Sequence, residues 1–350
     1  MTLRSILDIN RSELEDILVN TLSCKKFRVD QVWEWIYTKR VVDFSQMKNL
    51  PKNLRFELSS RFSFYIPGIL DQKQSKDGSI KLLLEYDIGC VECVIMPFED
   101  RVSLCVSTQI GCAVGCSFCY TATMGFKHNL DYTQILTQFL VANRISETQL
   151  KRPITHVVYM GMGEPFLNYS NTLKSLEKLT SSEYYNLSVR SITVSTSGIC
   201  DKIVSFAKDS KCGLAISLGS AVDEKRTKLM PINKNYGLKR LKEALLQYQK
   251  ISSKLITVEY ILIHNLNTSL QDVKALVKFL TYLRVKVNLI PLNASPNDSY
   301  FPPLEEEILN FREYLVSKRI PAPVRYSRAS DIYGACGQLR TLNESNNKKN

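Results

Sequence analysis

The chain has 350 residues, of which 44% are hydrophobic and 23% charged, as in a soluble globular protein with a large core. No apolar run reaches the roughly 18 residues of a membrane span, and the N-terminus does not have the shape of a signal peptide. We therefore expect a cytoplasmic protein that does not span a membrane. In that compartment its ten cysteines are mostly thiols, cluster ligands or catalytic groups rather than a disulfide framework.

The chain is strongly basic, with 46 Lys and Arg against 34 Asp and Glu and a formal net charge of +12. An excess of this size makes a polyanion such as nucleic acid a candidate partner, although a basic solvated surface has the same composition. Charge does not indicate which nucleic-acid sequence is bound, because phosphate contacts carry no sequence information.

Residues 1–97 form the first predicted unit, which is mainly helical. Apolar spacing predicts one helix over residues 12–18 and a second, amphipathic helix over residues 27–37. The aromatic residues of the second helix are more typical of a core than of a platform on which bases stack. Two apolar runs, at residues 81–85 and 91–97, predict a pair of strands at the end of this accessory unit.

From about residue 100, short apolar runs alternate with longer helical stretches. The predicted strands are 102–106, 154–160, 191–195, 213–218, 256–262 and 286–291, and the predicted helices are 132–145, 169–180, 199–208, 238–248, 270–283 and 304–315. This alternation predicts an α/β fold with a parallel sheet. Six units are fewer than the eight of a closed TIM barrel, so residues 98–325 are predicted to form a partial (β/α)6 barrel with its active site at the strands' carboxyl ends.

Three cysteines, Cys112, Cys116 and Cys119, follow the first barrel strand with the spacing C-x3-C-x2-C. Three thiolates are one fewer than a closed zinc or iron–sulfur site needs. A cubane cluster held this way keeps one iron free to bind a substrate. The alternative is a zinc site completed by a distant ligand, in a zinc-stabilised RNA-binding protein. The chain has only three histidines and no second tight cysteine pair, which favours the cluster.

A glycine-rich turn, Y-M-G-M-G-E-P over residues 159–165, ends the second barrel strand. Its glycines let the backbone approach a small ligand, and Glu164 beside Gly163 can accept hydrogen bonds from an ammonium group. The ends of later strands carry a further set of candidate ligand contacts, namely Ser195, Ser217, Leu218, Gly219 and Asn293. Each of these taken singly could be only a cap, but together they predict a pocket.

Two further cysteines are candidates for chemistry. Cys105 lies in the first barrel strand, and Cys336 lies in the turn G-A-C-G-Q-L of the segment 326–350, whose polar end from about Thr341 we expect to be disordered. Small neighbours would leave the Cys336 sulfur accessible, although they could equally serve only the turn. The other cysteines are assigned to the buried structural thiols that lone cysteines usually are: Cys24, Cys90, Cys93, Cys200 and Cys212.

The cysteine loop together with the Gly163–Glu164 turn resembles the radical S-adenosylmethionine (SAM) superfamily. In that superfamily C-x3-C-x2-C binds a [4Fe–4S] cluster whose free iron is chelated by SAM. Nearly the whole chain resembles its adenine-C2 RNA methyltransferases, through residues 27–28, 33–37, 91–92, 97, 107–109, 124–126, 161–165, 229–233, 288–291 and 335–339. The chain departs from the family's usual residues at Gly219, Leu292 and 120–122, which concerns the SAM contacts and not the cluster ligands.

The resemblance implies a mechanism that uses two SAM molecules, because C2 of adenine is not nucleophilic. The family first methylates a cysteine, here Cys336; a 5′-deoxyadenosyl radical then removes hydrogen from that methyl group, and the carbon radical adds to C2. A second thiol, here Cys105, helps to resolve the adduct and leaves a Cys105–Cys336 disulfide, while Glu92 matches the family's proposed acid/base residue. The implied SAM contacts are Gly163, Glu164, Ser195, Ser217, Leu218, Gly219 and Asn293.

The resemblance also implies the partners. The substrate would be an adenine of 23S ribosomal RNA and, as in some members, the adenine just 3′ of a transfer RNA anticodon, extruded into the pocket while residues 1–97 grip the surrounding RNA. The electron donor would be a protein such as flavodoxin or ferredoxin. We expect a monomer, since one chain supplies every needed group. The related C8 methyltransferase, which shares both cysteines, stays open as an alternative, whereas a radical SAM activase would need neither cysteine.

Overall fold

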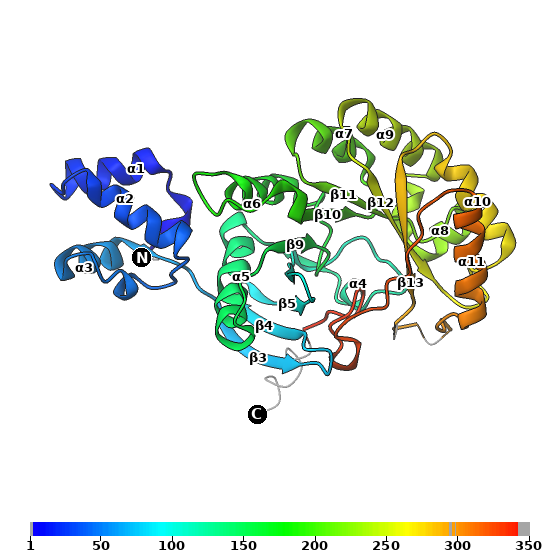
Figure 1. Ribbon diagram of the computed structural model, residues 1–350, viewed down its shortest axis with the longest axis horizontal. Helices are drawn as coiled ribbons and strands as arrows, with labels where there is room; N and C mark the ends of the chain where they lie inside the picture. The colour runs from blue at the N-terminus through cyan, green and yellow to red at the C-terminus, as the bar shows by residue number, and fades with distance from the viewer. Residues whose placement is uncertain (1–2, 294–295, 298, 342–350) are drawn as a thin grey trace.

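The structure is a computed structural model, and it describes residues 3–293, 296–297 and 299–341. Its largest feature is a nine-stranded sheet (Figure 1). Six strands of this sheet are parallel neighbours in chain order: β6 (Val102–Cys105), β9 (His156–Tyr159), β10 (Ile192–Thr196), β11 (Gly213–Ser217), β12 (Ile256–Leu262) and β13 (Val285–Pro291). Strand β13 is an edge of the sheet. The six strands therefore form an open, partial barrel, and the predicted fold is confirmed.

Helices follow the parallel strands and cover the outside of the curved sheet (Figure 1). They are α5 (Tyr132–Ile145), α6 (Tyr169–Thr180), α7 (Cys200–Asp209), α8 (Asp223–Leu229), α9 (Leu238–Ile251), α10 (Leu270–Leu280) and α11 (Glu305–Ser317). All but α8 were predicted, with ends a few residues from those observed. Helix α8 has the sequence D-E-K-R-T-K-L, in which only Arg226 and Leu229 are buried, so it lacks the apolar stripe that would have indicated a helix.

The sheet continues beyond β6 with three antiparallel strands, β5 (Gly89–Pro97), β4 (Ile80–Tyr86) and β3 (Gly68–Gln74). The predicted pair is thus present as β4 and β5. Strand β3 is additional; its sequence G-I-L-D-Q-K-Q is exposed along nearly its whole length, as expected of an edge strand. Because β3, β4 and β5 belong to the barrel's own sheet, we propose that the separate helical unit ends near residue 63 rather than at residue 97.

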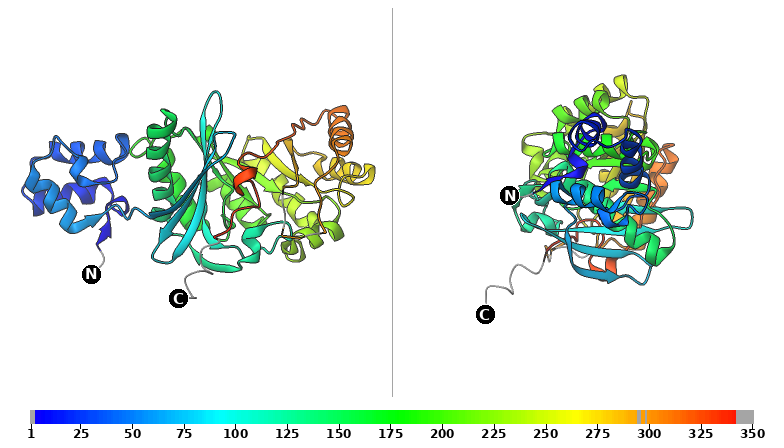
Figure 2. Two further views of the ribbon diagram at one scale, coloured as in Figure 1. Left: turned by 90° about the horizontal axis from the view of Figure 1, so that it is seen from below. Right: turned by 90° about the vertical axis from the view of Figure 1, so that its left-hand side faces the viewer.

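The N-terminal unit lies at one end of the molecule (Figures 1 and 2). It consists of α1 (Arg11–Glu15), α2 (Phe27–Trp33), α3 (Lys52–Arg61) and a short parallel pair, β1 (Arg4–Ser5) with β2 (Phe62–Ser63). Helices α1 and α2 lie where helices were predicted, and α3 is additional. Trp33 and Tyr37 are buried against the rings of Tyr184 and Tyr185, and the Trp33 indole donates to the Glu183 carbonyl at 2.5 Å. These aromatic residues therefore join the unit to the barrel, as core residues would.

A small hairpin and a helical turn lie between β6 and α5. The hairpin is β7 (Gln109–Gly111) with β8 (Phe126–Asn129), and the turn is α4 (Tyr120–Thr123). The tail predicted to be disordered falls in residues 342–350, outside the described part of the chain. Within residues 3–293, 296–297 and 299–341, no helix is both long and apolar enough to cross a bilayer.

Candidate active site

The cysteine loop is shaped by glycines in the β7–β8 hairpin. Gly111 has φ +72°, and a Cβ atom there would lie 1.7 Å from the Gly125 carbonyl oxygen, so no other residue fits. The next residue, Cys112, donates its backbone N–H to that same oxygen at 3.0 Å. Gly115 has φ +73° and turns the chain between the first two cysteines. The loop's far side is attached to the barrel, because the Ser117 N–H donates to the Leu229 carbonyl at 2.9 Å.

The three loop thiols line one cavity, which encloses about 990 Å³ of empty space with its open mouth included. Burial, together with the neighbouring thiols and the Glu164 carboxylate, raises the pKa of Cys112 to about 12 and that of Cys116 well above its ordinary value. A cationic metal centre reverses this effect, since it stabilises the thiolates that bind it. In the described chain, no three Cys, His, Asp or Glu side chains converge on a single-ion site. A cubane needs no such convergence, because each thiolate binds a different iron.

The glycine-rich turn faces the same cavity. Gly163 has φ +99°, and a Cβ atom there would lie 2.6 Å from the Gln109 side chain. The buried Glu164 carboxylate accepts hydrogen bonds from the backbone N–H groups of Phe166 at 3.0 Å and Ser197 at 2.7 Å. Burial raises the pKa of Glu164, and these N–H donors oppose the rise. The carboxylate is thus held rigidly at the cavity wall, in a place suited to a ligand's ammonium group.

The structure brings most, but not all, of the predicted ligand contacts into this cavity. Gly163, Glu164, Ser195, Ser217 and Gly219 line it. The lining drawn from the described residues does not include Leu218 or Asn293. The Leu218 side chain is buried, and Asn293 instead donates its side-chain amide to the Ser327 hydroxyl at 2.8 Å. Their contact with SAM stays a prediction.

The cavity also contains a carboxylate that was not predicted, Glu259 in β12. It pairs with Ser217 across the parallel strands β11 and β12, which puts both side chains on the same face of the sheet. Asn288 donates its amide to Glu259 at 3.0 Å, and burial raises the pKa of the carboxyl group. A single charged residue inside the apolar run I-T-V-E-Y-I-L was the signal that could have identified it.

Cys336 reaches the cavity from the C-terminal segment. Two hydrogen bonds tie its turn to the cysteine loop: Tyr120 N–H to the Gly337 carbonyl, and the Thr121 hydroxyl to the Leu339 carbonyl, both at 2.7 Å. Cys336 is exposed, as predicted, and lines the cavity, while the atoms packed around its thiol desolvate that group. This desolvation, with the nearby carboxylate of Glu259, raises the pKa of the Cys336 thiol to about 11.

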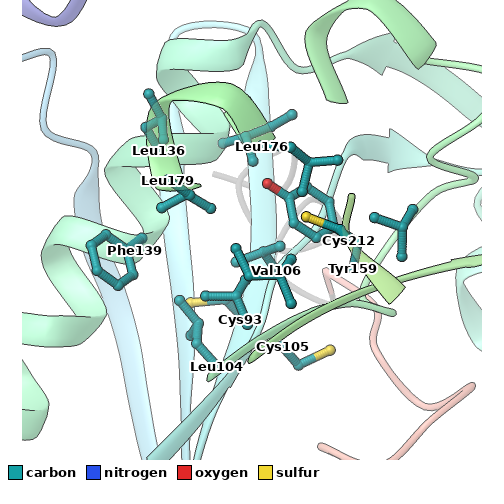
Figure 3. Close-up of a cluster of buried hydrophobic side chains, with 14 of the residues drawn as sticks. Cys93, Leu104, Cys105, Val106, Leu136, Phe139, Tyr159, Leu176, Leu179 and Cys212 are labelled. Atoms are coloured by element: carbon teal, nitrogen blue, oxygen red, sulfur yellow. The ribbon is translucent and has the colours of Figure 1, made fainter. Parts of the chain in front are cut away.

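Cys105 and Glu92 lie behind this turn, within the sheet. Cys105 is buried in β6, and its sulfur points away from Leu104 and Cys93 (Figure 3). Burial raises the pKa of Cys105, and the nearby Cys336 raises it further. Glu92 is buried in β5, and its pKa is raised by burial, although the ammonium of Lys81 opposes the rise at a distance of 2.9 Å. Among the described residues, those that line the cavity include neither Cys105 nor Glu92.

An open parallel barrel that places three closely spaced thiols and a glycine–carboxylate turn in one cavity, at the strands' carboxyl ends, defines a radical SAM enzyme. The comparisons agree. The radical SAM superfamily profile matches residues 106–280, and the profile "Ribosomal RNA large subunit methyltransferase N-terminal domain" matches residues 5–63. The chain resembles a crystal structure of a radical SAM methyltransferase from Sphaerobacter thermophilus with a TM-score of 0.91 and 38% identity, over 96% of this chain and 99% of that one.

Curated relatives identify the family. The chain is 42% identical over 351 residues to a probable dual-specificity RNA methyltransferase RlmN of Petrotoga mobilis, covering 99% of this chain and 100% of the relative. It is 38% identical over 345 residues to the dual-specificity RNA methyltransferase RlmN of Lawsonia intracellularis, covering 96% of each. The chain belongs to the RlmN family of radical SAM RNA methyltransferases. The predicted family, enzyme class and cofactors, a [4Fe–4S] cluster and SAM, are confirmed.

Proposed function

We propose that the enzyme methylates C2 of an adenine in 23S ribosomal RNA, and of the adenine 3′ of the anticodon in transfer RNA, through a methyl group carried on Cys336. One observation carries this proposal: Cys336 lines the same cavity as Glu164 and the three loop thiols, although it lies more than 200 residues from those thiols in the chain. The "dual-specificity" in the relatives' names supports two kinds of RNA substrate.

The cavity residues divide by the group each would hold. Cys112, Cys116 and Cys119 would hold the cluster, and the wall formed by Gly163, Glu164, Ser195, Ser217 and Gly219, with Leu218 and Asn293 nearby, would hold SAM. When bound, these groups supply an activated methyl group and a 5′-deoxyadenosyl radical. The apolar part of the lining, which includes Ile261 and Ile290, would keep water away from reactive carbon centres.

The two remaining cysteines act in sequence on the methyl group. The Cys336 sulfur gives up its proton and takes up a methyl group. After one hydrogen atom of that methyl group has been removed by the 5′-deoxyadenosyl radical, its carbon would form a bond to C2 of the adenine. C2 would then give up its own hydrogen as a proton, and one electron would pass to a protein electron carrier.

The Cys105 thiolate would then attack the Cys336 sulfur and break its bond to the methylene carbon. That carbon would take up a proton and leave as the methyl group of the base. A disulfide would remain between the two residues, and a thiol or protein reductant would open it before the next turnover. A thiol buried directly behind the methyl carrier suits this step, because it is kept from competing reactions until the adduct forms.

Glu92 would exchange a proton with the adenine during this sequence. A buried carboxyl group with a raised pKa can take up and release a proton near neutral pH more readily than an exposed one. Its carboxylate also binds Lys81 and accepts the Arg340 N–H at 2.9 Å, so it stands next to the Cys336 turn.

The same proposal includes the partners. The N-terminal unit would grip RNA around an extruded adenine, and a protein such as flavodoxin or ferredoxin would supply electrons. We also propose that the protein is cytoplasmic. We propose a monomer, because one chain contributes the three loop thiols, Cys336, Cys105 and Glu92.

The test is anaerobic reconstitution of the full chain with iron and sulfide, followed by reaction with SAM, a reductant, and 23S ribosomal RNA or transfer RNA fragments. Mass spectrometry of the digested RNA is expected to show 2-methyladenosine in both, and none with C336A. The control C24A removes a cysteine outside the cavity. Formation of 8-methyladenosine would identify a C8 methyltransferase instead, and methylation by C336A would exclude the carrier cysteine.

A further inference from the structure

Lys81 in β4 is a buried lysine whose side chain lies on the same face of the sheet as that of Cys105. In the antiparallel ladder Lys81 pairs with Val94, and Val94 pairs with Cys105 in β6. Directly paired residues place their side chains on one face, so Lys81 and Cys105 share a face, and Glu92, two positions from Val94, shares it too. Only 10% of the Lys81 side chain and 6% of the Glu92 side chain are exposed.

The ammonium group of Lys81 has two partners. It lies 2.9 Å from one carboxylate oxygen of Glu92, and it donates to the Tyr333 carbonyl at 3.1 Å. The other carboxylate oxygen of Glu92 accepts the Arg340 N–H at 2.9 Å. Tyr333 precedes Cys336 by three residues and Arg340 follows it by four. One ion pair therefore holds both flanks of the Cys336 turn.

The flank at Tyr333 needs such a partner. Tyr333 has φ +53°, a left-handed conformation that residues other than glycine seldom adopt without tertiary support. Farther upstream, the segment is attached to the β3–β4 turn, where Asp331 accepts hydrogen bonds from the Ser75 hydroxyl at 2.5 Å and the Lys76 N–H at 3.1 Å. Lys81 continues this attachment up to the residues that adjoin Cys336.

We propose that Lys81 is a positioning residue for methyl transfer: its ion pair with Glu92 clamps the Cys336 turn at both ends and so holds the methyl-accepting sulfur over the cavity and beside Cys105. The proposal rests on the proposed function of Cys336. It assigns Lys81 no contact with SAM or RNA, and it gives Glu92 a structural task in addition to proton exchange.

The test compares K81M, K81R and the control K225M, which breaks another lysine–carboxylate pair, Lys225 with Asp272, in helices α8 and α10. Each full-length protein is reconstituted with its cluster, and three quantities are measured: cluster absorbance, 5′-deoxyadenosine formation, and methyl incorporation at Cys336 by peptide mass spectrometry. For K81M we expect unchanged cluster absorbance and deoxyadenosine formation but at least about tenfold slower methylation of Cys336, since misplacing a reacting group by 1 Å costs that much or more. K81R is expected to methylate Cys336 at a rate between those of K81M and wild type. K225M is expected to methylate it at the wild-type rate.

A second variant covers the case in which K81M folds poorly because Glu92 is left unpaired. K81M/E92Q removes both charges, and it is expected to show the same slow methylation of Cys336. Methylation at the wild-type rate in both variants would overturn the proposal. So would a parallel loss of cluster, deoxyadenosine and methylation, which would indicate a merely structural lysine.

A separate measurement keeps failure of this proposal distinct from failure of the proposed function. If wild-type protein methylates RNA but never carries a methyl group on Cys336, the proposed function is wrong. The clamp is then tested by alkylation of Cys336 with iodoacetamide in the wild-type protein and K81M. Release of the turn is expected to change this rate at least about tenfold, and an unchanged rate would overturn the clamp.

Discussion

The cysteine loop and the Cys336 turn meet in one cavity, but they are held there in different ways. The loop is shaped by its own hairpin, through Gly111, Gly115 and the Gly125 carbonyl. The turn is held from outside by Lys81, Glu92, Tyr120 and Thr121, which lie in three separate parts of the chain. In Figures 1 and 2 the red C-terminal segment accordingly runs from the side of β13 across to the antiparallel strands. The cysteine loop is therefore shaped by local contacts, whereas Cys336, the proposed methyl carrier, is placed by contacts with distant parts of the chain.

The largest expected effect comes from removing a loop thiol. C116A leaves two of the three thiolates that would hold the cluster, so cluster absorbance, iron content and RNA methylation should all be lost, with activity down at least about a thousandfold. C24A, which removes a half-buried thiol elsewhere, should retain all three. Full activity in C116A would mean that the loop does not hold the cluster.

Removing Cys105, the proposed resolving thiol, should affect release of the RNA without affecting the cysteine loop. C105A should retain the cluster and methylate Cys336, but it should accumulate a covalent protein–RNA adduct, with turnover reduced about a hundredfold or more. Denaturing gels with labelled RNA detect such an adduct. The control C93A changes a buried thiol on the opposite face of the sheet and should give no adduct. Normal turnover in C105A would contradict the role of Cys105.

A single methyl group added at Gly111 should disrupt the β7–β8 hairpin. G111A would force a Cβ atom to within 1.7 Å of a backbone oxygen at a positive φ, so we expect a loss of at least about 2 kcal/mol in unfolding free energy together with loss of the cluster. Denaturant unfolding and iron analysis measure both. G125A is the control for the positive φ alone, because Gly125 also has a positive φ but no atom lies within 4 Å of the added Cβ atom. Equal stability of G111A and wild type would show that the loop can relax.

The matching glycine-to-alanine substitution in the Cys336 turn should have a smaller effect, limited to methylation of Cys336. G337A also meets a positive φ, of +82°, but its nearest neighbour, the Phe118 carbonyl oxygen, is 3.4 Å away. We expect about tenfold slower methylation of Cys336, corresponding to about 1.4 kcal/mol, with the cluster retained. Mass spectrometry of Cys336 and cluster absorbance test this. Loss of the cluster in G337A would mean that the two regions are less independent than their contacts indicate.

The smallest expected effect concerns a distant support of the loop. Ser117 contacts the Tyr300 hydroxyl at 3.0 Å, and Glu307 holds the neighbouring segment through Thr268, His264 and the Leu304 N–H. Burial raises the pKa of Glu307, but these hydrogen bonds outweigh it and lower the pKa to about 2. Because folding lowers its pKa, the ionised Glu307 carboxylate stabilises the fold at pH values above 4.5, the ordinary pKa of a glutamate. This stabilisation disappears as the pH falls through about 2, where the carboxylate takes up a proton in the folded protein.

E307Q should therefore reduce the unfolding free energy by about 1 kcal/mol at pH 7, and the difference from wild type should shrink as the pH falls from about 4.5 toward 2. Thermal unfolding across this pH range measures it. E306Q, on the same helix, is the control. A difference that stays constant with pH would show that the Glu307 charge does not contribute.

Much of the fold could be predicted from local patterns. The apolar runs of the six parallel strands and the apolar stripes of their helices are visible in any short window, and burial on one face or both produces them. Elements without such burial were missed: the exposed edge strand β3 and the charged helix α8. The cysteine spacing and the G-E-P turn also lie within short windows, so the three thiols and the carboxylate that share the cavity could be selected from the sequence.

The rest depends on contacts between residues far apart in the chain. Lys81 and the surroundings of Cys336 carry no local signal of their role, and for Glu259 the only local signal is a charge inside an apolar run. A lone carboxylate in a strand has meaning only once the register places it opposite Ser217, and Lys81 only once β4 lies beside β5 and the C-terminal turn folds over both. Short-range sterics and burial produce patterns that are visible in the sequence itself. Strand register and long-range hydrogen bonds arise only when the chain packs, and they determine where Cys336 lies.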